Sequence, residues 1–130
     1  MLRYAMTNAV PIRAFKTAWF SKAAAKAGVS DEALMTAIQQ VIQGQADDLG
    51  GGVFKKRLNQ NRHRSIVLAK GGRYWVYAYL FAKKDRANIE PEELSAFRKL
   101  AEAYGRMTDL ELASALREGD LLELSDEKQT

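Results

Sequence analysis

The sequence predicts an α+β fold, because segments with helical periodicity lie on both sides of one block that has the composition of β-strands. Residues 53–81 are rich in Val, Ile, Tyr, Trp and Phe and contain a Gly-Gly pair, as expected for an antiparallel hairpin. A chain of 130 residues has room for one core, so we expect one domain. We place it at residues 12–124, between a flexible leader (1–11) and a frayed tail (125–130).

The N-terminal part predicts a short strand and two helices. Arg13–Lys16 can form the strand, and Trp19–Ala27 consists largely of good helix formers and is followed by a glycine. Ser30 is a suitable N-cap for a second helix, which we expect to end near Gly44. Gln45–Gly52 contains three consecutive glycines, so we expect it to be a loop.

The strand-forming block predicts three strands: Val53–Leu58, Arg64–Lys70 and Arg73–Phe81. We expect Gly71-Gly72 to form a two-residue turn, which would fix the register of the second hairpin. Leu68 would then lie opposite Trp75. Arg64 would lie opposite Tyr79.

Two more helices and an edge strand are predicted after this block. Pro91 is suited to the first position of a helix. Thr108 and Glu111 have the spacing of a capping box for a last helix, which Gly119 would end. Asp120–Leu124 can add a strand at the edge of the sheet.

Charge is unevenly distributed along the chain. Residues 55–86 contain ten Lys or Arg and one Asp, whereas residues 87–130 contain five Lys or Arg and eleven Asp or Glu. The formal net charge of +4 therefore hides a strongly basic sheet region and an acidic helical region. A basic sheet surface of this kind favours a large anionic partner, and we expect that partner to be a nucleic acid.

Strand periodicity places Lys55 and Arg57 on the same face. If the loop after the first strand has four residues, Arg57 lies opposite Arg64, on the face that also carries Tyr79. A five-residue loop would bring Lys56 to that face instead. Cations gathered on one face repel each other, a cost that is expected where a site awaits an anion. Their charge would also lower the pKa of a neighbouring lysine, which could then act as a general base.

Two other interpretations of these residues stay open. Lysines and arginines on an exposed strand are often solvated, or protect a sheet edge from aggregation. Tyr74, Trp75 and Tyr77 favour packing in the core or across strands rather than stacking on bases, and only Tyr79 is a candidate for both.

Composition excludes several classes of site. The absence of Cys excludes disulfides, thiol catalysis and zinc ribbons, and the single His excludes a multi-histidine metal site. We expect no cofactor and no metal. The N-terminal residues lack the apolar stretch of a signal peptide, and no run of residues reaches membrane-spanning length. We therefore expect a cytoplasmic protein that does not bind a membrane.

Four segments resemble the RelE/ParE superfamily of bacterial toxins, in the branch of the RelE-like and HigB-type toxins: GGVFKKRL (51–58) with Arg64, FAKKDRANI (81–89), and more weakly the segments 93–104 and 116–124. The resemblance covers residues 12–124. It implies a small, mainly antiparallel twisted sheet with two N-terminal helices and C-terminal helices. It also implies a toxin that enters the ribosome and cleaves mRNA without a metal, using the RNA 2′-hydroxyl as nucleophile.

The resemblance further implies roles for individual residues. Lys55 would be the general base, Arg57 and Arg64 would hold the scissile phosphate, and Lys84 would assist the leaving group. Further RNA contacts are expected from Lys56, Arg62, His63, Tyr79, Lys83 and Arg86. RelE has a tyrosine a few residues after the basic group that follows the last strand, and Glu90 occupies that position here.

Partners follow from the same resemblance: a cognate antitoxin, the ribosome and mRNA, with the oligomeric state of the free toxin left open. Two alternative functions remain. ParE-like members share the fold and inhibit DNA gyrase, although they do not need the basic trio at 55, 57 and 64. A non-catalytic nucleic-acid-binding relative is the third possibility, and Glu90 is the departure that keeps it open.

Overall fold

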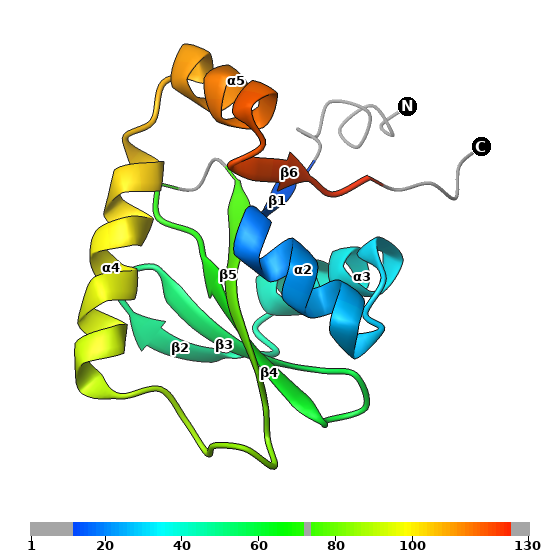
Figure 1. The fold of residues 1–130 in the computed structure, drawn as a ribbon. Coiled ribbons are helices and arrows are strands. Elements are labelled where there is room, and N and C mark those ends of the chain that lie inside the picture. Colours follow the sequence, from blue (N-terminus) through cyan, green and yellow to red (C-terminus); the bar gives the residue numbers. More distant parts are fainter. Residues whose placement is uncertain (1–11, 72–73, 126–130) are drawn as a thin grey trace, which may run out of the picture.

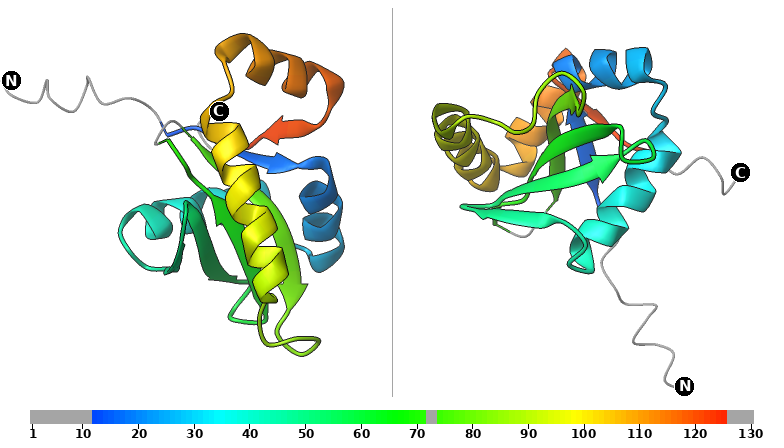
Figure 2. Two further views of the ribbon diagram at one scale, coloured as in Figure 1. Left: turned by 90° about the vertical axis from the view of Figure 1, so that its left-hand side faces the viewer. Right: turned by 90° about the horizontal axis from the view of Figure 1, so that it is seen from below.

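Residues 12–71 and 74–125 are described by the computed structural model, which contains a six-stranded mixed sheet with helices packed on both faces (Figures 1 and 2). The strands are β1 (Ala14–Thr17), β2 (Asp47–Gly50), β3 (Val53–Leu58), β4 (His63–Leu68), β5 (Trp75–Ala82) and β6 (Leu121–Glu123). The helices are α2 (Ala18–Ala27), α3 (Asp31–Ile42), α4 (Pro91–Gly105) and α5 (Asp109–Glu118). The predicted α+β class is confirmed. The predicted leader and residues 126–130 of the predicted tail lie outside the described residues.

The strand order is β2-β3-β4-β5-β1-β6, so β1 is inserted between two strands that come much later in the sequence. β1 runs parallel to β5, and the other strand pairs are antiparallel. β6 forms the edge beside β1, with Leu122 opposite Lys16, which confirms the predicted edge strand. The sheet is thus mainly antiparallel, as the resemblance implied.

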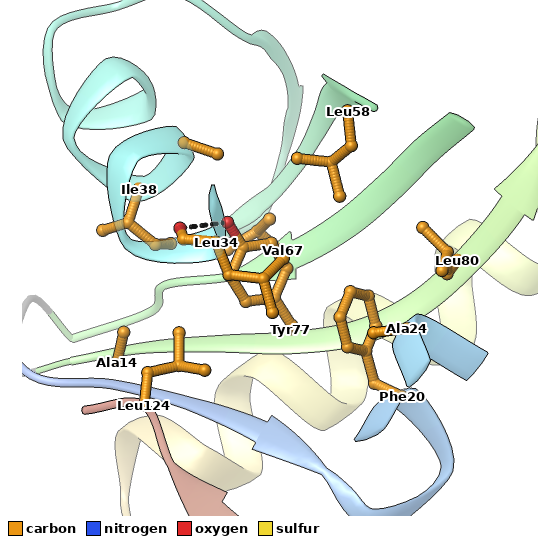
Figure 3. Close-up of a cluster of buried hydrophobic side chains, with 11 residues drawn as sticks. Ala14, Phe20, Ala24, Leu34, Ile38, Leu58, Val67, Tyr77, Leu80 and Leu124 are labelled. Carbon is orange, nitrogen blue, oxygen red and sulfur yellow. Dashed lines mark hydrogen bonds between the residues drawn. The ribbon is translucent and has the colours of Figure 1, made fainter. Parts of the chain in front are cut away.

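Two hydrophobic clusters hold the helices on the sheet. On one face, α2 and α3 bury Phe20, Leu34 and Ile38 against residues of β4 and β5 (Figure 3). The hydroxyl of Tyr77, which is fully buried in this cluster, donates to the Leu34 carbonyl over 2.7 Å. On the other face, α4 and α5 pack on Ile66 and its apolar neighbours in the sheet. Both faces of the sheet are therefore buried over most of its area.

Local capping explains where the helices begin and end. Gly28 has φ +74° and closes α2, and the side chain of Ser30 accepts from the backbone of Ala33 to begin α3. The Thr108 hydroxyl and the Glu111 carboxylate form the reciprocal bonds of a capping box at the start of α5. These predicted boundaries are confirmed.

The prediction that residues 45–52 form only a loop is wrong, because Asp47–Gly50 is strand β2. It pairs with β3, placing Asp47 opposite Lys55. Gly51 and Gly52 form the tight turn between the two strands, and both have positive φ, as does Gly50 at the end of β2. Arg98 of α4 donates to the carbonyl of Gly50 and to that of Leu49, which holds this turn against the helix.

The predicted register of the second hairpin is also wrong. Leu68 lies opposite Val76, not Trp75, and Arg64 lies opposite Phe81, not Tyr79. Next to the turn, the pairing already lies one residue further along β5 than predicted. A bulge then adds a second residue: Ile66 pairs with Tyr79 and the next residue of β4 pairs with Tyr77, so one residue of β5 has no partner. Gly71 lies in the turn, and residues 72–73, on which the predicted Gly-Gly turn also depends, lie outside the described residues.

Candidate nucleic-acid interface

Three predicted site residues lie together on the face of the sheet that α4 partly covers. β3 and β4 are joined by residues 59–62, a four-residue connection, and Arg57 is directly opposite Arg64. Lys55 lies one pleat further along β3 on the same face. Tyr79 lies opposite Ile66, which itself lies opposite Lys55, so it joins this face through the bulge rather than through the predicted pairing with Arg64.

The two arginines form a like-charge pair. Directly opposite residues of antiparallel strands have Cα atoms about 4.5–5.5 Å apart. Arg57 is exposed and has no hydrogen-bond or ion-pair partner among the described residues. Arg64 is half-buried, and its Nη1 donates to the carbonyls of Asn61 (3.1 Å) and His63 (3.2 Å). Neither guanidinium is neutralised by a carboxylate of the described chain, so the pair presents uncompensated positive charge.

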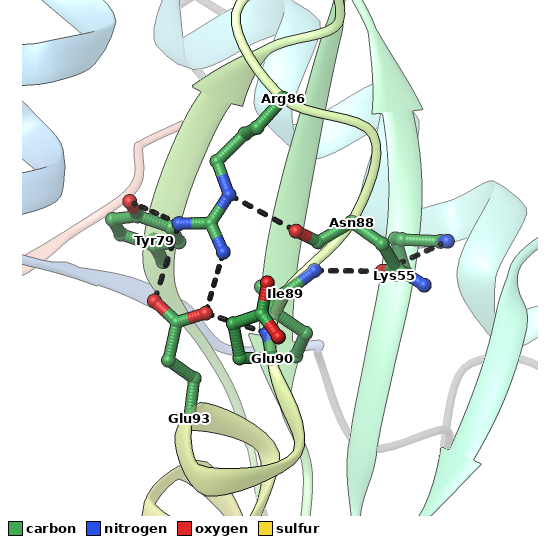
Figure 4. Close-up of polar contacts among 7 residues, drawn as sticks. All are labelled: Lys55, Tyr79, Arg86, Asn88, Ile89, Glu90 and Glu93. Carbon is green, nitrogen blue, oxygen red and sulfur yellow. Dashed lines mark hydrogen bonds and ion pairs between the residues drawn. The ribbon is translucent and has the colours of Figure 1, made fainter.

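Lys55 has a different environment from the arginines. Its Nζ donates to Oδ1 of Asn88 over 3.2 Å (Figure 4). The same Nζ lies 3.8 Å from Oδ2 of Asp47. Asn88 Oδ1 also accepts from the backbone of Ile89, which fixes the amide in place. The side chain of Lys55 is 16% exposed. These contacts hold the amine between the sheet and the loop that follows β5.

Arg86 anchors that loop. Its Nη1 and Nη2 donate to the Glu93 carboxylate over 3.2 and 2.6 Å, Nη1 also donates to the Tyr79 hydroxyl, and Nε donates to the Asn88 carbonyl (Figure 4). The Glu93 carboxylate raises the pKa of Arg86. In turn, the hydrogen bonds from Arg86, and to a smaller extent the one from the Glu90 backbone, lower the pKa of Glu93. Arg86, predicted as an RNA contact, thus has most of its donors engaged within the protein.

Glu90, the residue that the resemblance places at the tyrosine position, is the N-cap residue of α4. Its backbone N–H donates to Oε1 of Glu93 over 2.6 Å, and Pro91 follows at the first helical position. Glu90 is exposed, and in Figure 4 it lies beside the group that links Glu93 to Arg86. The position therefore starts a helix next to the site.

The remaining predicted residues lie elsewhere. Lys56 points to the opposite face, is 9% exposed, and donates to the Gln45 carbonyl; burial, and then the charge of Arg57, lower its pKa. Lys84 and His63 line two grooves beside α2, and neither stands in the row formed by Lys55 and the arginines. Arg62 and Lys83 line one of these grooves, and their turns are joined by a bond from Lys83 N to Arg62 O over 2.9 Å.

Sequence reasoning missed two groups of residues near this surface. Asn88 and Asp47 hold the amine of Lys55, and no local pattern connects positions so far apart. Trp19, Lys22 and Lys26 of α2 line the first groove. Their i, i+3, i+7 spacing in WFSKAAAK is a signal that could have revealed a shared helical face.

Two further observations concern metals and membranes. Within residues 12–71 and 74–125, no group of three or more His, Cys, Asp and Glu side chains lies close enough to hold a metal ion. None of the helices in the same ranges combines the length and the apolar character that crossing a membrane requires.

Comparison with known proteins identifies the family. A family model described as the RelE toxin of the RelE/RelB toxin–antitoxin system matches residues 12–124, which is nearly the whole chain. Searches of curated proteins and of solved structures gave no match. The match spans every strand and helix of the sheet domain, together with Lys55, Arg57 and Arg64. The chain therefore belongs to the RelE family and is a RelE-type toxin of a toxin–antitoxin system.

Proposed function

We propose that this toxin is a ribosome-dependent mRNA endonuclease that acts through the RNA 2′-hydroxyl. The observation that carries the proposal is the Arg57–Arg64 pair, two adjacent guanidinium groups without a carboxylate partner among the described residues. Arginine keeps its charge at all physiological pH values and offers a fork of donors that matches phosphate oxygens. A phosphodiester placed between the two would relieve their repulsion and gain charge-assisted hydrogen bonds.

The reaction uses groups on and beside this face. The 2′-hydroxyl attacks the neighbouring phosphorus while the bond from phosphorus to the 5′ oxygen breaks, which leaves a 2′,3′-cyclic phosphate and a 5′-hydroxyl. Lys55 first releases its own proton to water and then, as the neutral amine, takes the proton of the 2′-hydroxyl. Arg57 and Arg64 stabilise the charge that develops on the phosphoryl oxygens. Lys84 gives a proton to the leaving oxygen. The atoms and charges balance without a further reactant.

Asn88 and Asp47 bear on the role proposed for Lys55. They hold its amine at the end of the row formed with Arg57. For the amine to accept a proton it must leave the Asp47 carboxylate and turn to the RNA. RNA phosphates on the arginines would draw the Lys55 side chain away from Asp47, because they add negative charge on the other side of it.

Cleavage of a defined message on translating ribosomes tests the proposal. Removing one donor that stabilises a transition state costs about 100- to 1,000-fold in rate, so we expect Arg64→Ala and Arg57→Ala to lose activity on that scale. Lys99→Ala, which removes an exposed cation of α4 that lines neither groove beside α2, is the matched control and should cleave normally. Full cleavage by Lys55→Ala or Arg64→Ala would refute the assignment.

A supercoiling assay with DNA gyrase runs beside the ribosome assay. Cuts in phase with codons support the nuclease, whereas lost supercoiling without cuts would identify a gyrase inhibitor of the ParE type. If the protein neither cuts the message nor blocks supercoiling, it is a non-catalytic relative. Family membership implies an antitoxin, and we propose that an acidic segment of it covers the same basic face.

A further inference from the structure

A groove of about 700 Å³ lies between α2 and the far half of β5. β1 pairs with β5 only as far as Lys16 opposite Tyr77, whereas β5 continues to Ala82. The last residues of β5 therefore have no neighbouring strand on that side, and α2 runs beside them. The groove is the space that this early departure of the chain from the sheet leaves open.

An aromatic stack forms one end of the groove. Trp19 of α2 stacks on Tyr79 with ring centroids 5.0 Å apart and an interplanar angle of 28°. Tyr79 continues the column to Phe97, with centroids 5.9 Å apart. Trp19 is nevertheless 51% exposed, which is unusual for so large an apolar side chain. A flat ring that is supported on one side and open to solvent on the rest is suited to receive another flat ring.

Cations line the groove beyond the stack. Lys22 and Lys26 follow Trp19 on the same face of α2, and Lys84 faces them from the turn after β5. None of these three amines has a hydrogen-bond or ion-pair partner among the described residues. Among the described residues that line the groove, Asp85 is the one acid. Positively charged side chains without an ion-pair partner therefore outnumber negatively charged ones along the groove.

A second groove of about 680 Å³ continues this surface around the tip of the β3–β4 hairpin. It shares Lys26, His63 and Lys84 with the first groove and adds Arg62 and Lys83. Arg62 lies at the hairpin tip, two residues before Arg64 of the proposed catalytic face. An RNA strand that leaves the Arg57–Arg64 pair can thus pass the hairpin tip and enter the grooves beside α2.

We propose that these grooves bind single-stranded RNA flanking the cleavage point, with one unstacked base on Trp19 and phosphates on Lys22 and Lys26. Stacking on an aromatic ring beside lysines that track the backbone is the general way in which proteins bind single strands without reading sequence. This inference rests on the proposed function for the identity of the ligand. It adds a binding site on the α2 side of the sheet, away from the row of Lys55 and the arginines.

Binding of a 2′-O-methyl RNA octamer to the purified full chain tests the site, because the blocked hydroxyl prevents cleavage. We expect Trp19→Ala to weaken binding by about 5- to 150-fold, the effect of losing one base–aromatic stack. Trp19→Phe should restore most of the affinity. The double variant Lys22→Ala/Lys26→Ala should lower the slope of log affinity against log salt by about 1.4, since two phosphates lose their partners. Lys99→Ala is the control.

A direct signal comes from a Trp75→Phe background, in which Trp19 is the remaining tryptophan. RNA should quench its emission. The proposal would be overturned if Trp19→Ala bound the octamer with unchanged affinity and the double lysine variant kept the salt slope of the wild type. An acidic peptide that quenches Trp19 where RNA does not would overturn it too, and would assign the groove to a protein partner. Circular dichroism checks the fold of Trp19→Ala, and the lysine variant removes no apolar contact.

The two proposals fail separately. If the Arg57 and Arg64 variants stop cleavage while Trp19→Ala binds the octamer like the wild type, only the groove is refuted. If Trp19→Ala loses affinity for the octamer but the protein cuts no message, the groove stands and the nuclease reaction is refuted.

Discussion

Replacing Arg57 by glutamate is expected to make the fold more stable and the toxin inactive. In the wild type, Arg57 lies directly opposite Arg64, and neither has a carboxylate partner among the described residues. Arg57→Glu replaces this repulsion by a cross-strand ion pair. The same change removes one of the two proposed phosphate ligands and repels the RNA backbone.

The size of the stabilisation follows from the register. Two unit charges about 6 Å apart in a largely aqueous environment interact by about 0.7 kcal/mol, and cross-strand pairs contribute about 0.2–1 kcal/mol. Arg57→Gln removes the repulsion alone and should stabilise by about 0.5 kcal/mol. Arg57→Glu also adds the attraction and should stabilise by about 1–1.5 kcal/mol. At about 4 °C per kcal/mol for a domain of this size, the glutamate variant should melt about 4–6 °C higher.

Thermal unfolding at about 0.02 M and about 0.5 M salt measures this effect. The gain should shrink at high salt, because exposed charges are screened over a few ångströms there. The order of midpoints should be glutamate, glutamine, arginine. A glutamate variant that melts at or below the wild type at low salt would show that the two guanidinium groups do not oppose folding, and the argument for an anion site at this pair would fail with it.

Three further predictions concern the scaffold around the site. Arg86 and the Glu90 backbone lower the pKa of Glu93, so the ionised carboxylate stabilises the fold. Glu93→Gln should therefore melt lower than the wild type at pH 7, and this difference should disappear as the pH falls below about 4.3, the unfolded-state pKa. A difference in melting midpoint that stays constant from pH 7 to 3 would contradict this. Gly105→Ala should destabilise by about 1 kcal/mol in urea unfolding despite its better helix propensity, because a Cβ there would lie 2.9 Å from the Lys70 carbonyl oxygen. Tyr77→Phe should cost about 1 kcal/mol in the same assay through loss of its buried hydrogen bond, and no loss would show that this bond adds nothing net.

The parts of this fold that depend on local chemistry could be predicted from the sequence. Ser30 and Thr108 accept hydrogen bonds from backbone N–H groups three residues later, and Gly119 ends a helix in the left-handed conformation. The structure has helices that begin and end at these residues. Pro91 likewise begins α4. Strand β3 was predicted with its bounds because Val53–Leu58 has strong strand-forming composition between clear breaks.

The rest depends on contacts between distant residues. β2 has weak strand propensity, and it forms because Asp47–Gly50 can pair with β3 and because Arg98 holds the turn between them. The bulge in β5 has no local signal, and together with a one-residue offset at the turn it moves Tyr79 from the predicted place opposite Arg64 to a place opposite Ile66. Of the candidate site, the basic row on β3 and β4 could be predicted from periodicity, whereas the groove beside α2 requires the folded arrangement.

The placement of β1 has a consequence for how the protein folds. Residues 14–17 find one neighbour in β5 and the other in β6, so the N-terminal strand has no place in a sheet until the chain has been made past residue 82. Its second side is covered only after residues 121–123. Contacts between such distant segments close large loops, which slows folding. During synthesis, the sheet therefore stays incomplete, and the side of β1 that pairs with β6 stays uncovered, until residue 123 has left the ribosome.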